Sequence, residues 1–322
     1  NTYTASINDD NNFEETFKGE DKPIFPHDIP NLRATNDNYS ILKAIPAGNS
    51  FTTDFAKETI IKENLGKGKY TDFLAISYSS TDYVGHQFGV ASKEIEDTYL
   101  RLDKDLESLL TFLDKKIGKD NYTLFLTADH AAVHVPSYLQ SLKIPSGYFS
   151  YEKFKSFLNN AILKTFNSNE LIESISNFQV FLNKEKVKAL KLKYDDIVNL
   201  IVNESINYNG IYKSVAAKTM QSNTFTNGIL STLQNGYNQK FSGDVLLIPN
   251  PSTISYSKKG SSHGSGYSYD THVPAIFYGK GIKRGSSKKK YNITDITPTL
   301  SNLLKIEFPN GNTGIVIDEI LE

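Results

Sequence analysis

The sequence contains no cysteine among its 322 residues. This absence excludes disulfide bonds, zinc sites built on thiolates and a cysteine nucleophile. It does not fix the location of the protein, because a cysteine-free chain suits both reducing and oxidising compartments. Any zinc site in this chain has to use nitrogen and oxygen ligands.

The sequence also lacks long apolar runs and an excess of charge of one sign. No apolar run approaches the ~20 residues that a membrane span needs, and no signal peptide opens the chain. The 35 Lys and Arg residues nearly balance the 36 Asp and Glu residues. We therefore expect no nucleic-acid partner and no membrane partner, and we interpret Lys288–Lys290 as a solvated turn.

The length and the 39% hydrophobic content allow a substantial core, divided into two domains. Residues 1–38 are polar and lack periodicity, which is typical of an irregular surface leader or linker. Residues 39–150 and 241–322 are expected to form an α/β core. Residues 151–240 have helical periods, short strands and no histidine, which predicts an inserted α+β subdomain. It is either a cap that shapes the substrate site or a structural insertion.

A strand–helix–strand unit is predicted in the first half of the core. Phe73–Ser79 and Tyr122–Leu126 read as strands buried on both faces. Between them, Ser92–Lys116 is an amphipathic helix with Ser92 as its N-cap. A right-handed parallel crossover would place the carboxyl ends of both strands at one edge of a sheet, where chemistry collects in α/β folds.

Four further elements are predicted along the chain. They are a helix at Thr52–Leu65, a strand of the main sheet at Gly243–Pro249, a strand at Val273–Tyr278 and a capped helix at Asn292–Leu304.

Histidines and aspartates follow the predicted strands. Asp129 and His130 stand directly after the second strand, and a desolvated charged pair of this kind needs compensation, for which a metal cation is suited. Asp82 and His86 lie four residues apart in a glycine-containing loop after the first strand, and His263 lies in a loop rich in Gly and Ser. Such ligands at short spacing are typical of zinc sites. An isolated histidine is more often structural, and His27, in the polar leader, is interpreted so.

Three motifs in order, TDYVGH, TADH and SSHGS-Y-YDTHVP, resemble the metal-binding motifs of the alkaline phosphatase superfamily. Within it the chain is similar to the type I phosphodiesterase/nucleotide pyrophosphatase branch, and there to the periplasmic alkaline phosphatases of Bacteroidota that use a threonine nucleophile. The resemblance runs through nearly the whole chain. It implies an alkaline phosphatase-like sheet, mostly parallel, with helices on both faces. Ala131 replaces a glycine found in many relatives, which concerns backbone freedom and not ligation.

The resemblance implies a two-zinc site that hydrolyses phosphate esters. Asp82, His86 and His263 would bind one zinc, and Asp129 and His130 would bind the second. Apart from the resemblance, the position of His134 just past the Asp129 loop suggests that it supports these ligands, and His272, which enters a strand, either does the same or hydrogen-bonds the backbone. Two cations about 3.5–4 Å apart stabilise the attacking and leaving oxygens of an in-line phosphoryl transfer.

The same resemblance indicates what the chain does not contain. In the family, the nucleophilic threonine, another aspartate ligand of the second zinc, an asparagine and a Lys-x-Arg pair precede the first of these motifs. Residues 1–38 hold no strand followed by a threonine-bearing helix, and Thr52 and Thr53 fall in a structural helix. The chain is therefore expected to be the C-terminal part of a periplasmic or secreted phosphatase, inactive without an N-terminal segment and binding at most one zinc well.

Other functions remain open. A phosphodiesterase or nucleotide pyrophosphatase would use the same metals, and the residues that would discriminate lie outside this chain. A metal-free, non-enzymatic binding domain is the alternative from another class. A manganese-dependent phosphoglycerate mutase and a calcium-dependent sulfatase fit the histidine-bearing loops poorly.

Overall fold

The computed structural model describes residues 3–322, which divide into two compact units. Unit 1 takes the chain up to Ile41 together with Asp82–Glu96 and His130–His272. Unit 2 takes Leu42–Thr81, Asp97–Asp129 and Val273–Glu322. Helices and strands occur in both units, so the predicted α/β class is confirmed.

Unit 1 is built on a four-stranded antiparallel sheet in the order β3-β4-β6-β5. Its apolar core is formed by the sheet and the helices α6 and α8, with Phe154, Ile162 and Ile201 fully buried. The elements are β3 (Ile172–Ser176), β4 (Gln179–Leu182), β5 (Ile211–Ala216), β6 (Val245–Pro249), α6 (Tyr151–Phe166) and α8 (Tyr194–Ser205).

The position of β6 corrects one prediction. The apolar run at Gly243–Pro249 was expected in the main sheet, but β6 pairs with β4 and β5, with Val245 opposite both Val180 and Ala216. All five residues of β6 are buried. A continuous apolar run has no alternation that identifies its partner, so sequence alone could not choose between two sheets.

Smaller elements connect the rest of unit 1. β2 and β7 pair in parallel. The elements are α1 (Ile29–Leu32), η1 (Arg33–Thr35), α3 (Ser80–Phe88), α5 (Pro136–Ser141), β2 (Gly147–Tyr148), α7 (Lys184–Ala189), α9 (Ala217–Ser222), α10 (Gly228–Asn235), β7 (Thr253–Ile254) and α11 (Ser268–Thr271). Of α3 only the residues from Asp82 onward belong to unit 1.

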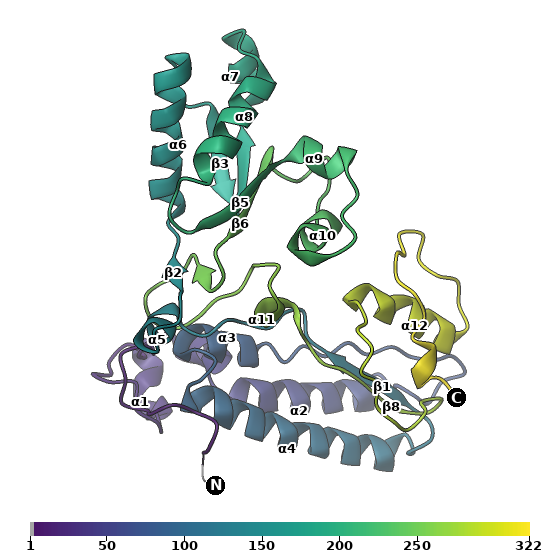
Figure 1. The fold of residues 1–322 in the computed structure, drawn as a ribbon. Helices are drawn as coiled ribbons and strands as arrows, with labels where there is room; N and C mark the ends of the chain where they lie inside the picture. Colours follow the sequence, from purple (N-terminus) through teal and green to yellow (C-terminus); the bar gives the residue numbers. More distant parts are fainter. Residues whose placement is uncertain (1–2) are drawn as a thin grey trace. The chain divides into compact units, whose positions relative to one another are not determined.

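Unit 2 combines an antiparallel strand pair with two helices that run side by side (Figure 1). In the helix pair, Ser50 Oγ donates to Asp105 Oδ2 at 2.9 Å and Lys57 Nζ donates to Ser108 Oγ at 2.7 Å. The elements are η2 (Asn38–Ala44), α2 (Ala47–Lys62), α4 (Lys93–Lys116), β1 (Thr123–Thr127), β8 (Ala275–Gly279), η3 (Ile293–Asp295), α12 (Ile296–Leu304) and η4 (Asp318–Ile320). Of η2 only the residues from Leu42 onward belong to unit 2, and of α4 only those from Asp97 onward.

Parallel pairing is scarcer than the sequence predicted. Among residues 3–322 only β2 and β7 pair in parallel, and Phe73–Ser79 is not assigned to a strand. A strand exists only with a hydrogen-bonded neighbour. Phe73 is 61% exposed, so this segment has strand-like composition without the burial that its apolar residues indicated.

The start of α2 differs from the predicted helix by five residues. The helix begins at Ala47, so Thr52 and Thr53 lie inside it and do not cap it. Their hydroxyls donate to the carbonyls of Gly48 and Asn49 one turn earlier. Neither hydroxyl stands at a helix N-terminus, where a helix stabilises anions, so both threonines lie in a structural helix as expected.

Residues 1–38 were expected to be a surface leader. The described part is irregular apart from short helical turns, and Glu14 and Phe17 within it are buried. Glu96 accepts hydrogen bonds from the backbone N–H groups of Thr4, Ala5 and Ser6, which fixes the segment to the start of α4 within unit 1. Among residues 3–322, every helix is too short or too polar to cross a lipid bilayer.

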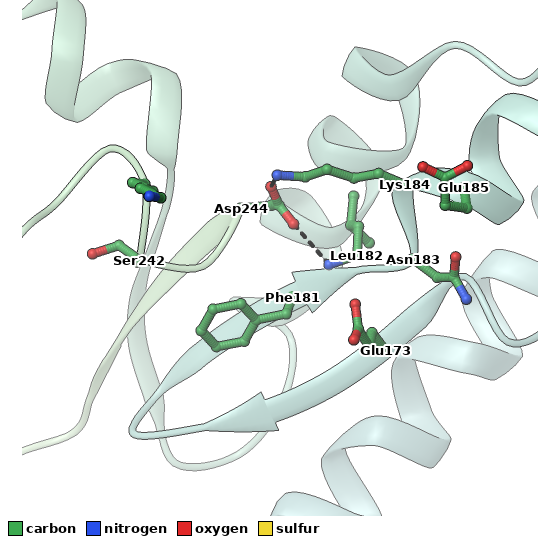
Figure 2. Close-up of a pocket in the computed structure, with 9 residues that line it drawn as sticks. Glu173, Phe181, Leu182, Asn183, Lys184, Glu185, Ser242 and Asp244 are labelled. Atoms are coloured by element: carbon green, nitrogen blue, oxygen red, sulfur yellow. Dashed lines mark hydrogen bonds and ion pairs between the residues drawn. The ribbon is translucent and has the colours of Figure 1, made fainter.

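Asp244 is a buried carboxylate that contacts the end of β4 (Figure 2). Its side chain is 8% exposed and accepts hydrogen bonds from the Leu182 N–H at 2.7 Å and the Tyr194 hydroxyl at 2.6 Å. Lys184 Nζ, on a side chain that is 69% exposed, lies 3.0 Å from Asp244 Oδ1.

We predict that Asp244→Ala destabilises the protein by about 1–3 kcal/mol, because it leaves a buried N–H without an acceptor. Lys184→Ala removes only the exposed partner and should cost less than about 1 kcal/mol. Urea denaturation followed by circular dichroism measures both variants. Equal losses would contradict the assignment of the main contribution to the buried hydrogen bonds.

Candidate metal site

Two of the predicted ligands, Asp82 and His86, lie on one face of α3. The sequence predicted a glycine-bent loop here, but the segment is helical, and the glycine at position 85 is accommodated inside the helix. Residues four apart on a helix face the same direction. His86 Nε2 therefore lies 3.4 Å from Asp82 Oδ1.

The loop around Ser261 fixes the ring of His86. His86 Nδ1 lies 2.8 Å from the Ser261 carbonyl oxygen, so Nδ1 carries the proton and donates it. The Ser261 N–H donates back to the carbonyl of His86 at 3.1 Å, and the fully buried Ser261 hydroxyl donates to the carbonyl of Val133. A carbonyl partner at one ring nitrogen is the usual means of directing the other toward a metal.

Gly260 allows this loop to approach the end of α3. Its φ is +70°, and a Cβ at this position would lie 2.0 Å from the carbonyl oxygen of His86. Glycine has no Cβ, so it adopts this positive φ without strain and does not clash with the His86 carbonyl. The Gly260 N–H donates to the carbonyl of Phe13 at 2.8 Å, which fixes the loop from its other side.

His263 completes a group of three. One ligand atom from each of Asp82, His86 and His263 lies within 4.8 Å of the other two. Burial lowers the pKa of His263, and the neighbouring His130 and His86 lower it further. The His263 imidazole is therefore neutral at neutral pH and has a lone pair available for a cation.

His130 lies against the same group. Its ring stacks on that of His263 with centroids 3.3 Å apart and an interplanar angle of 16°. His130 Nε2 is 3.8 Å from Asp82 Oδ1. Asp129, the residue before it, is exposed and belongs to unit 2, two residues after the end of β1.

The two histidines expected to support the ligands are both exposed. The ring of His134 packs against Tyr138 at 5.9 Å. His272 caps α11, where its N–H donates to the carbonyl of Ser268. Their supporting role stays a prediction.

Asp270 is a structural residue of this site that the sequence analysis did not single out. It is 4% exposed, and its Oδ2 accepts hydrogen bonds from the N–H and the hydroxyl of Ser265. Its carbonyl accepts the Ala131 N–H at 2.8 Å, which connects the His263 loop to the His130 segment. The sequence does contain a signal for this contact, because an aspartate five residues after a loop serine can accept hydrogen bonds from it.

A hollow of about 420 Å³ lies beside His86. Its lining includes Lys18, Lys259 and Glu15, and Lys259 Nζ lies 3.9 Å from Glu15 Oε1. The ring of Tyr256 lies 5.5 Å from that of His86.

The donor set fits a cation. In the neutral imidazole the Nδ1 proton is donated to Ser261, so the lone pair of Nε2 faces a carboxylate oxygen of Asp82 at 3.4 Å. Two facing lone pairs repel unless a proton or a metal lies between them. Two imidazoles and one carboxylate, with a further position open, are the ligands of many catalytic zinc sites.

Comparison with known proteins defines the class of this chain. The family model described as type I phosphodiesterase/nucleotide pyrophosphatase matches residues 7–273. The chain belongs to this family, which lies in the alkaline phosphatase superfamily.

Particular relatives match the whole chain. It is 45% identical over 325 residues to a protein of Myroides odoratus named calcium-transporting ATPase and 43% identical over 321 residues to the alkaline phosphatase PhoV of Synechococcus elongatus. It is 38% identical over 323 residues to the alkaline phosphatase PafA of Elizabethkingia meningoseptica. These alignments cover 100% of the chain and 59%, 58% and 59% of the relatives.

The fold agrees with these matches. The crystal structure of wild-type PafA superposes with a TM-score of 0.93 at 37% identity, covering 98% of this chain and 60% of that one. The chain therefore spans about 60% of its relatives and has the fold of the corresponding part of PafA.

We predict that Gly260→Ala weakens zinc binding by about tenfold or more without unfolding the protein, because the loop has to withdraw from His86. Gly264→Ala is the matched control: Gly264 also has a positive φ, of +124°, but has no atom within 4 Å of its Cβ position. Isothermal titration with zinc measures both. An equal loss in both variants would attribute the effect to backbone strain and not to the contact with α3.

Zinc titration also distinguishes among the histidines. His86→Ala should lower zinc affinity by about 100-fold or more, since the site loses a ligand and Asp82 loses its neighbour. His134→Ala should retain at least half of the affinity, because this exposed ring packs on Tyr138. A strong effect of His134→Ala together with a weak one of His86→Ala would refute the proposed ligand set.

Proposed function

We propose that the whole protein hydrolyses phosphate monoesters as a zinc-dependent alkaline phosphatase. The observation that carries the proposal is the convergence of Asp82, His86 and His263 within 4.8 Å. Two relatives that match the entire chain at 43% and 38% identity are named alkaline phosphatases. A relative named as a calcium-transporting ATPase has similar identity, but the His and Asp donors at this site suit metal-assisted hydrolysis better than transport.

In this proposal Asp82, His86 and His263 hold one zinc. A zinc ion bound there would stabilise negative charge on a reacting phosphoryl or alkoxide oxygen. The chain itself supplies orientation: the Ser261 carbonyl fixes the tautomer of His86, and Asp270 braces the loop that carries His263. The lowered pKa of His263 keeps its imidazole unprotonated and able to ligate near neutral pH.

A second zinc would take Asp129 and His130, together with a ligand that we do not find in this chain. We expect no turnover from the chain by itself, because no residue in it is assigned as the nucleophile. In this proposal the substrate is a phosphate ester. The partner of this chain is an N-terminal segment of the same protein that carries the nucleophilic threonine. We also infer a periplasmic or secreted location, and we propose that residues 151–240 are an inserted α+β subdomain.

The second candidate is a phosphodiesterase or nucleotide pyrophosphatase of the same superfamily. The description of the matching family model favours it. The same metals would serve a diester. Whether the protein prefers monoesters or diesters therefore depends on how its site accommodates the second substituent of the phosphate.

The test compares p-nitrophenyl phosphate with bis-p-nitrophenyl phosphate as substrates of the whole protein and of this chain alone. We expect the monoester to be turned over at least about 100-fold faster by the whole protein. His86→Ala should abolish that activity, whereas His134→Ala should keep most of it. Preference for the diester would establish the second candidate, and activity of the chain alone would place the nucleophile within it.

A further inference from the structure

A second cluster of acidic side chains lies in unit 1, formed by Asp9, Glu14 and Glu94. One carboxylate oxygen from each lies within 4.8 Å of the other two. Glu14 is fully buried, Glu94 is 4% exposed and Asp9 is 8% exposed. The cluster contains none of the residues assigned to the candidate metal site.

Two oxygens of this cluster have no hydrogen-bond partner among residues 3–322. They are Glu14 Oε2 and Asp9 Oδ1, and both are shielded from solvent. The other oxygen of each carboxylate is occupied: Asn11 Nδ2 donates to Glu14 Oε1 at 2.6 Å, and the Phe25 N–H donates to Asp9 Oδ2 at 3.0 Å. A buried carboxylate oxygen without a partner is costly, so an additional ligand is indicated at this point.

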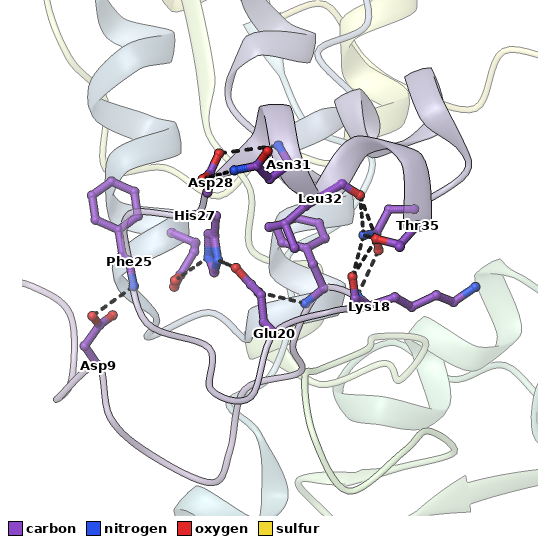
Figure 3. Close-up of polar contacts among 12 residues, drawn as sticks. Asp9, Lys18, Glu20, Phe25, His27, Asp28, Asn31, Leu32 and Thr35 are labelled. Atoms are coloured by element: carbon purple, nitrogen blue, oxygen red, sulfur yellow. Dashed lines mark hydrogen bonds and ion pairs between the residues drawn. The ribbon is translucent and has the colours of Figure 1, made fainter.

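The neighbouring cations do not balance the charge. His27 lies between Glu20 and Glu94, with Nδ1 2.7 Å from Glu20 Oε1 and Nε2 3.0 Å from Glu94 Oε1, and Figure 3 shows its contact with Glu20. Lys93 Nζ lies 3.3 Å from Asp9 Oδ2. Four carboxylates against these two cations leave two negative charges uncompensated when all are ionised.

The chemistry of the donors selects the kind of ligand. Both nitrogens of His27 are used by carboxylates, so the cluster offers oxygen donors alone. Oxygen-only sites favour hard cations, and Ca²⁺ accepts oxygens at about 2.3–2.6 Å. Two oxygens on opposite sides of one Ca²⁺ are then about 4.6–5.2 Å apart, which accommodates the 4.8 Å limit of this cluster.

We propose that Asp9, Glu14 and Glu94 form a binding site for a hard divalent cation, with Ca²⁺ as the best-fitting ion. The cation balances the two excess charges and supplies a partner to Glu14 Oε2 and Asp9 Oδ1. Backbone carbonyls and water would complete its coordination.

The site connects the N-terminal segment to the candidate metal site. The Glu15 N–H donates to the carbonyl of Gln87 at 3.0 Å, and the carbonyl of Phe13 accepts the Gly260 N–H at 2.8 Å. Residues 13–15 thus contact both α3 and the loop that fixes His86. A cation held by Glu14 stabilises this segment and, through it, the position of Gly260.

The test adds Ca²⁺ to the metal-stripped protein, with zinc held at a constant concentration. Titration calorimetry should show one Ca²⁺ site, and saturation at 100 times the Kd should raise Tm by about 5 °C or more. Mg²⁺ should bind more weakly, because it requires shorter bonds in a stricter octahedron. Absence of Ca²⁺ binding and of any Tm change would overturn the proposal.

Glu14→Gln is the informative variant, because it keeps the shape and still accepts from Asn11 but removes the charge. Asp10→Asn is its control: Asp10 is exposed and paired with Lys22 at 2.7 Å. Glu14→Gln should lose the rise in Tm caused by Ca²⁺, whereas Asp10→Asn should keep it. Loss in both variants, or in neither, would contradict a site centred on Glu14.

The dependence on pH distinguishes a cation from a proton shared within the cluster. Burial raises the pKa of Glu14 from 4.5 to about 8, opposed by the hydrogen bond from Asn11 and reinforced by Glu94 and Asp9. The folded protein then binds more protons than the unfolded chain between pH 4.5 and 8, so without Ca²⁺ its stability falls as pH rises through that window. Ca²⁺ should remove this fall at pH 8. A fall that Ca²⁺ leaves unchanged would show that a proton alone occupies the cluster.

Discussion

The contact between the Gly260–Ser261 backbone and the end of α3 is the interaction on which the candidate metal site depends. It fixes the tautomer of His86 through the carbonyl of Ser261, and it brings the loop of His263 to a helix more than 170 residues earlier in the chain. A histidine on a free helix surface would rotate. Here the proton on Nδ1 has one acceptor, and Nε2 is left facing Asp82. The orientation of His86 therefore depends on the approach of the Gly260–Ser261 backbone to α3, which only glycine at position 260 permits.

Unit 1 contains two kinds of arrangement around charged side chains. At Asp244 every buried oxygen has a protein partner, so the carboxylate needs no ligand. At the partly exposed Asp82 and His86 two acceptor atoms face one another when His86 is neutral, and at the buried Asp9 and Glu14 one oxygen of each carboxylate has no donor. The first arrangement is structural, and the others indicate cations, because facing acceptors repel each other and a buried acceptor without a partner is costly.

The sequence predicted several helices well where the local pattern was strong. The strand predicted at Tyr122–Leu126 lies within one residue of β1, and the amphipathic run after Ser92 is a helix with Ser92 Oγ accepting the Ile95 N–H. Strand pairing was predicted poorly. β6 joined a different sheet, and Phe73–Ser79 forms no strand, since pairing is decided by which backbone lies alongside and not by the strand's own residues.

By itself, the sequence determined the residues that can ligate a metal, their order in three motifs and the absence of thiolate chemistry, because these depend on residue type and spacing. Only the tertiary structure decided that Asp82 and His86 share a helix face, that Asp270 braces the His263 loop, and that Asp9, Glu14 and Glu94 converge. In the sequence Glu14 belongs to a polar leader that looked like surface. Burial, which no local pattern reports for a glutamate, turns it into a charge that requires a partner.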